Sequence, residues 1–178
     1  MKNTAELCSA DIYYEARIKI QRLPTYRGAV WLMSPVMDIL WNGVAGNEGV
    51  IGTEIDIIEN FSWEVNEYNS ALNWNGYNPR FRSALHRMST ESDVDIFDGE
   101  FHTFVLDWSP SEYMFYVDDQ VFWRVDGGSD FNNCGINQNP NYIKLTVERA
   151  DCSQALSADF IENEMLIDYI RVYNQPRK

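Results

Sequence analysis

The chain has 178 residues, of which 45% are hydrophobic and 14% aromatic, and its formal net charge is −13. This composition supplies one folded domain with an apolar core, and it excludes a disordered chain or a small disulfide-rich scaffold. The excess of acidic residues argues against nucleic acid as a partner, because that binding depends on clusters of Lys and Arg. No apolar run approaches the roughly 20 residues of a transmembrane helix, so we expect no membrane partner.

Alternation of apolar and polar residues predicts a series of β-strands and no amphipathic helix. The predicted strands are 13–20, 29–33, 53–59, 101–108, 113–117, 121–125, 142–149 and 165–173. Loops rich in Asn, Gly, Asp and Ser are predicted at 66–78, 89–98 and 126–141. The strongest hairpin signal is Asp118-Asp119-Gln120 between two short strands. Many short strands with polar loops indicate an antiparallel sandwich or barrel, and residues 1–178 are expected to form a single domain.

Three carboxylates follow one another closely in Glu54-Ile55-Asp56-Ile57-Ile58-Glu59. In a regular strand Glu54 and Asp56 share a face, whereas Glu59 would lie among the isoleucines, where a lone carboxylate is costly. A β-bulge at Ile57-Ile58 inserts one extra residue and returns Glu59 to the face of the other two acids. Crowded carboxylates raise one another's proton affinity, which is what an acid beside a nucleophile needs in glycoside hydrolysis. The alternatives are a solvated acidic strand face and, less well supported, a calcium site.

Two further groups of residues leave alternatives open. Cys134 and Cys152 flank a predicted strand, so a disulfide between them is one pairing that the sequence allows, and Cys8 makes the count odd. The cysteine spacing fits no zinc pattern, and we expect no metal site of this kind. The one local basic cluster is either a solvated loop or a contact for sulfate or carboxylate groups of an algal polymer; its members are Arg80, Arg82 and Arg87.

The carboxylate segment resembles the signature of glycoside hydrolase family 16, in the bulged form of laminarinases, agarases and carrageenases. Lichenases and xyloglucan-active members have one residue fewer before the second Glu. Further blocks resemble the family in its own order, and together they cover most of the chain: 14–19, 29–33, 101–110, 115–118 and 167–173.

The resemblance implies an all-β antiparallel sandwich, a concanavalin-like jelly roll with an open concave cleft. It implies Glu54 as the nucleophile, Glu59 as the general acid/base and Asp56 as the electrostatic partner between them. It also implies an extracellular or cell-envelope location, although no signal peptide is visible in this chain. No cofactor is expected beyond the structural calcium ion that family members often hold, and the protein is expected to be a monomer.

Aromatic and amide side chains near the predicted cleft are candidates for binding the substrate. Trp31 is either a floor for a sugar ring or a core residue, and Trp63 lies close to the signature. Trp74 stands in a predicted Asn/Gly loop, where burial explains a large aromatic less easily, so we interpret it as a substrate contact. Asn73 stands where family members often have His, and it can form a hydrogen bond but cannot change its charge.

The sequence differs from the family at its start, because few residues precede Tyr14 and the domain is expected to be shortened at its N-terminus. We predict a retaining endo-hydrolase whose partner is a polysaccharide, a neutral β-glucan with β-1,3 or mixed β-1,3/1,4 linkages. One alternative is an agarase-, porphyranase- or carrageenase-like hydrolase of an algal galactan. The other is a jelly-roll carbohydrate-binding protein without catalysis.

Overall fold

The computed structural model describes residues 11–20, 26–37, 52–61, 66–74, 76, 82–126, 136–149 and 164–174. Within these ranges every regular element is a β-strand. The strands are β1 (Ile12–Lys19), β2 (Tyr26–Met33), β3 (Thr53–Asn60), β4 (Glu67–Trp74), β5 (Arg82–Ser89), β6 (His102–Trp108), β7 (Glu112–Val117), β8 (Gln120–Asp126), β9 (Tyr142–Arg149) and β10 (Leu166–Tyr173).

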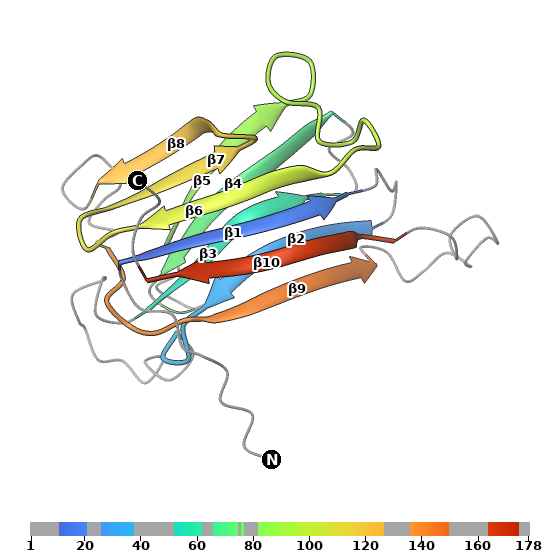
Figure 1. The fold of residues 1–178 in the computed structure, drawn as a ribbon. Coiled ribbons are helices and arrows are strands. Elements are labelled where there is room, and N and C mark those ends of the chain that lie inside the picture. The colour runs from blue at the N-terminus through green and yellow to red at the C-terminus, as the bar shows by residue number, and fades with distance from the viewer. Residues whose placement is uncertain are drawn as a thin grey trace.

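The strands form two five-stranded sheets that pack face to face (Figure 1). One sheet has the order β10-β1-β6-β7-β8 and the other the order β5-β4-β3-β2-β9. Neighbouring strands run antiparallel in both sheets. The all-β antiparallel sandwich expected from the sequence is confirmed, and the sheets remain open rather than closing into a barrel.

The core lies between the sheets and is built by the alternation that the sequence shows. Tyr14, Ala16 and Ile18 of β1 are at most 1% exposed, as the period of two requires. From the opposite sheet, Ile55 and Leu72 are fully buried against them in the same cluster. Because each strand turns one face inward, its other face is left for solvent or for a binding site.

The β7–β8 connection confirms the predicted hairpin. Asp118 and Asp119 have φ angles of 47° and 64°, the left-handed conformation that a two-residue turn needs to match the twist of its strands. Asp is tolerated there because its short polar side chain forms local hydrogen bonds. Asp118 also accepts a hydrogen bond from the backbone N–H of Thr103, 2.8 Å away, which attaches the turn to β6.

The prediction of a loop at 66–78 was wrong, since residues 67–74 form β4, and β5 was also missed. In β4 the apolar alternation of Tyr68, Leu72 and Trp74 is interrupted by Ser70, which weakens its signal. Four asparagines in and beside this segment, at positions 66, 69, 73 and 75, further favour a loop interpretation. Pairing with β3 and β5 on its two sides overrides that local preference.

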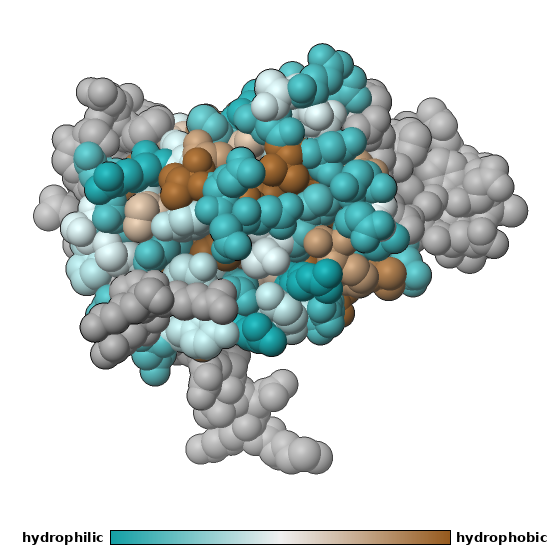
Figure 2. Space-filling model, turned by 45° about the horizontal axis from the view of Figure 1, so that its top comes forward, coloured by the Kyte–Doolittle hydropathy of each residue, from teal (hydrophilic) through white to brown (hydrophobic). Residues whose placement is uncertain are grey.

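Figure 2 shows a largely hydrophilic face on which hydrophobic side chains form separate patches. Among the described residues, the large hydrophobic side chains exposed to solvent are Leu85, Val121, Val147, Ile167, Val172 and Tyr173. Within the described ranges, no helix has the length and hydrophobicity needed to span a membrane.

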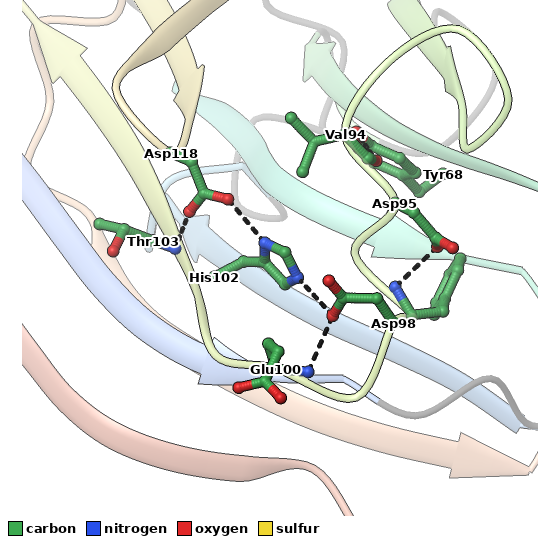
Figure 3. A network of polar contacts seen from close by, with 9 residues as sticks. Tyr68, Val94, Asp95, Asp98, Glu100, His102, Thr103 and Asp118 are labelled. Carbon is green, nitrogen blue, oxygen red and sulfur yellow. Dashed lines mark hydrogen bonds and ion pairs between the residues drawn. The ribbon is translucent and has the colours of Figure 1, made fainter.

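A buried histidine joins the β7–β8 turn to the loop before β6 (Figure 3). His102 Nδ1 lies 2.6 Å from Asp118 Oδ2, and its Nε2 lies 3.0 Å from Asp98 Oδ1. Asp98 also accepts a hydrogen bond of 2.8 Å from the backbone N–H of Glu100. Burial by itself lowers the pKa of His102, but the hydrogen bonds and charges of Asp118 and Asp98 outweigh it, so that the pKa is raised.

We expect this network to make stability depend on pH. Because the pKa of His102 is raised in the folded state, the stabilisation is complete below the ordinary histidine pKa and is lost as pH rises through the raised value. His102→Gln should therefore lower the free energy of unfolding near pH 6 by about 1 kcal/mol, discounted for the partly exposed carboxylates. The difference from wild type should shrink towards pH 9; urea unfolding at both pH values checks this, and a constant difference would contradict it.

Candidate active site

The acidic signature lies on β3, whose two faces differ sharply. Ile55, Ile57 and Ile58 are at most 1% exposed and pack in the core. Glu54, Asp56 and Glu59 all line one pocket of about 170 Å³ on the other face of the sheet. The three carboxylates therefore share one depression, and no member of the trio lies among the isoleucines.

A β-bulge produces this arrangement. On the β2 side, Asp56 pairs with Trp31 and Glu59 with Ala29, so two steps along β2 correspond to three steps along β3. On the β4 side, Asp56 pairs with Ala71 and Glu59 with Asn69, with the same shift of register. The bulge predicted at Ile57-Ile58 is confirmed, because the extra residue turns both isoleucines inward and restores the alternation before Glu59.

Two glycines adapt the chain around the ends of β3. Before the strand, Gly52 has a φ of 91°, and a Cβ there would lie 2.3 Å from the hydroxyl of Ser34. After the bulge, the backbone N–H of Gly28 donates to Asn60 Oδ1 at 2.9 Å. Position 52 therefore requires glycine, and the hydrogen bond to Asn60 attaches the end of β3 to β2.

Ser70 of β4 contacts the bulge at Ile57, a residue that has no partner in the pairing of β3 with β2 or with β4. Its hydroxyl donates a hydrogen bond of 2.5 Å to the carbonyl oxygen of Ile57, and both residues are buried. We expect Ser70→Ala to lower the free energy of unfolding by about 1–3 kcal/mol, because a buried carbonyl would be left unsatisfied. Denaturant unfolding measures this, with Ser83→Ala, at an exposed position of β5, as the control; equal stability of the two variants would contradict the assignment.

Asp56 is the most deeply buried of the three acids, with 3% of its surface exposed. Burial first, and then the negative charges of Glu59 and Glu54, raise the pKa of Asp56 well above its usual range. The charge of Arg27 and a hydrogen bond from Asn73 act in the opposite direction. Asp56 can thus hold a proton in the middle of the site at a pH where an ordinary aspartate is ionised.

One wall of the pocket is formed by alternate residues of β2 and β9. Arg27 donates to Glu148 Oε2 at 2.8 Å, and this bond is the main cause of the raised pKa of Arg27. Trp31 is half-buried, and its Nε1 donates to Thr146 Oγ1 at 3.1 Å. The ammonium of Lys144 lies 3.7 Å from the centre of the Trp31 ring, a cation–π contact. Contacts between side chains of β2 and β9 therefore hold this wall in place.

Sequence reasoning missed two of these wall residues, Arg27 and Thr146. A signal for Arg27 was present, because Arg27, Ala29 and Trp31 are two residues apart and share a face. The pairing of Thr146 with Ala29 depends on the β2–β9 register, which the sequence does not indicate.

The predicted substrate contacts have different outcomes. Trp31 lines the pocket, whereas Trp74 is 2% exposed and belongs to the core, so its interpretation as a loop residue was wrong. Successive side chains of a strand point to opposite faces of the sheet. Because Asn73 points to the carboxylates, its neighbour Trp74 must point into the core. Trp63 lies outside the described residues, so its predicted contact is not tested.

Other expectations of the sequence fall partly or wholly outside the described residues. These are the three cysteines, with the Cys134–Cys152 pairing, and Arg80 with the side chain of Arg82. Arg87 is described and pairs with Glu67 at 3.0 Å on the exposed surface. In the described part of the chain, no group of three or more His, Cys, Asp or Glu is arranged to hold a metal ion.

Comparison with known proteins identifies the family. The profile of "Glycosyl hydrolases family 16" matches residues 13–171. The chain belongs to glycoside hydrolase family 16. The family match thus spans all ten strands apart from Ile12 at its start and Val172 and Tyr173 at its end.

Three individual relatives are 22–23% identical to this chain. A curated beta-glucanase of Rhodothermus marinus is 23% identical in an alignment of 168 residues that covers 85% of this chain and 54% of that protein. The chain therefore spans about half the length of this curated relative. The endo-beta-1,3-glucanase of Pyrococcus furiosus superposes with a TM-score of 0.64 at 22% identity, covering 93% of this chain and 62% of the other. The kappa-carrageenase of Pseudoalteromonas carrageenovora gives 0.63 at 22%, covering 94% and 65%. At these identities the structural likeness establishes the fold.

Proposed function

We propose that this family 16 chain is a retaining endo-hydrolase of a neutral β-glucan with β-1,3 or mixed β-1,3/1,4 linkages. The observation that carries the proposal is the bulge of β3, which brings Glu54, Asp56 and Glu59 into one pocket. Three crowded carboxylates weaken a fold through their repulsion, and hydrolysis gives them a use.

In the proposed mechanism, Glu54 attacks the anomeric carbon, and a bond from its carboxylate oxygen to that carbon forms as the glycosidic bond breaks. Glu59 gives its proton to the departing oxygen. In the second step, a water molecule attacks the same carbon, its proton passes to Glu59, and the bond to Glu54 breaks. Asp56 lies between the two glutamates, and its affinity for a proton changes as the charges on Glu54 and Glu59 change.

A neutral substrate agrees with the charges that line the pocket. Four carboxylates surround it, and its cation Arg27 already pairs with Glu148. An anionic sugar would meet this negative surface, whereas hydroxyl groups can donate hydrogen bonds to it. The names of two relatives, a beta-glucanase and an endo-beta-1,3-glucanase, agree with this choice of polymer. We further propose that the enzyme acts outside the cell or in its envelope, where such polymers are found.

The test is a panel of laminarin, mixed-linkage glucan, agarose and carrageenan, with new reducing ends counted over time. We expect ends to appear with laminarin or with mixed-linkage glucan, and the first anomer detected by proton NMR to be the β form. Cleavage of galactans alone would replace the glucan by a galactan, and a first α-anomer would exclude retention. If a polymer slows the protein in affinity gels but is not cleaved, the protein is a carbohydrate-binding module.

A further inference from the structure

Asn73 of β4 links two of the three acids through a single side-chain nitrogen. Its Nδ2 donates to Glu54 Oε1 at 2.9 Å and to Asp56 Oδ2 at 2.8 Å. An amide nitrogen carries two hydrogens, so each acid can receive one of them. In the ladder Asn73 pairs directly with Glu54, which puts the two side chains on the same face of neighbouring strands.

We propose that Asn73 is a positioning residue, whose one amide group holds the carboxylates of Glu54 and Asp56 in a fixed relative orientation and favours their charged forms. This inference rests on the proposed function, in which Glu54 is the nucleophile. A nucleophile must be charged and correctly oriented before the bond forms, and hydrogen bonds from a fixed donor favour both conditions.

The charged groups described near the two acids come from other positions on the same sheet. From β3 itself, Glu59 adds a negative charge, and from β2 Arg27 adds a positive one that is already shared with Glu148 of β9. Lys144 of β9 lies over the Trp31 ring. On β5 the residue paired with Asn73 is Ser83, which carries no charge. Among the contacts described, Asn73 is the neutral donor that touches both acids.

The type of side chain matters for the pH range of the enzyme. An amide has no proton to lose near neutral pH, so its two hydrogen bonds do not weaken as pH rises. A histidine at this position would exchange a proton in that range and would offer only one ring N–H when neutral. The hold of Asn73 on the acids therefore changes only when the acids themselves are protonated.

Three variants test the proposal. Asn73→Ala removes the donor, and Asn73→Asp removes it while keeping the volume of the side chain. The control, Ser83→Ala, removes the hydroxyl of the residue that pairs with Asn73 on β5. We expect both Asn73 variants to lower kcat about 10- to 100-fold with little change in KM. The acid limb of their kcat/KM profiles should move up by about one pH unit, because a lost donor favours the protonated acids. Ser83→Ala should match wild type.

A readout without substrate separates this inference from the proposed function. Carboxyl-carbon NMR titration of Glu54 and Asp56 should show their protonation midpoints about one unit higher in Asn73→Ala than in wild type. Midpoints that coincide, in variants that unfold like wild type, would overturn the positioning role. If the wild-type protein cleaves no polymer, the proposed function fails, and the titration still decides whether Asn73 holds the two acids.

Discussion

Replacing Glu54 by Gln is expected to lower kcat by about 10⁴-fold or more, because an amide cannot form the covalent intermediate. Binding of the polymer should remain, since Gln has the same size and its carbonyl oxygen can still accept the hydrogen bond from Asn73. Reducing-end assays measure the turnover, and affinity gels with the same polymer measure the binding. A Glu54→Gln variant with a tenth or more of wild-type turnover would refute the role of Glu54.

Azide distinguishes the nucleophile from the acid/base when each glutamate is shortened to Ala. With an aryl glycoside whose leaving group needs no proton, Glu59→Ala should still form the intermediate, and azide should release it as a β-glycosyl azide. Glu54→Ala leaves space for azide on the opposite face of the sugar, so its product should be the α-azide. The reverse pattern of products would exchange the two roles.

Shortening Trp74 to Ala is expected to lower the free energy of unfolding by about 3–5 kcal/mol, because the indole is a large part of the core. That loss is a large fraction of the total stability of a domain of this size. Because the side chain of Trp74 is on the core face of its sheet, opposite the pocket, Trp74→Phe should keep the wild-type KM. Urea unfolding and polymer kinetics on the two variants separate these effects.

A Trp74→Phe variant that unfolds like wild type but shows a KM raised about tenfold would contradict the core assignment and return Trp74 to the substrate. The matched change on the pocket side is Trp31→Phe, which removes the bond from Nε1 to Thr146. That variant should show the opposite pattern, with a raised KM and a small loss of stability, because Trp31 lines the pocket and is half-buried.

The contrast between Asn73 and Trp74 shows what the sequence can and cannot predict. The trio of acids was predictable because its spacing has a local physical consequence: a lone Glu59 among isoleucines is costly, and a bulge is the simplest remedy. The identity of β4 was not predictable from composition, because Asn69, Ser70 and Asn73 together suggest a loop. These polar residues are tolerated in the strand because two of them contact β3, at its bulge and at its acids.

The pocket wall was the least predictable part. Which residues of β9 face Arg27 and Trp31 depends on pairing between segments more than a hundred residues apart, which local patterns do not encode.

The extra residue of β3 also has a genetic consequence. Because pairing with β2 and with β4 resumes after it on both sides, a gene that had lost the codon for Ile57 would still encode a strand in which Ile58 faces Val30 and Glu59 faces Ala29. Loss or gain of one codon there shifts no other position of the two ladders. The two lengths of acidic segment can therefore be reached from each other by a single mutational event, without rebuilding either neighbouring strand.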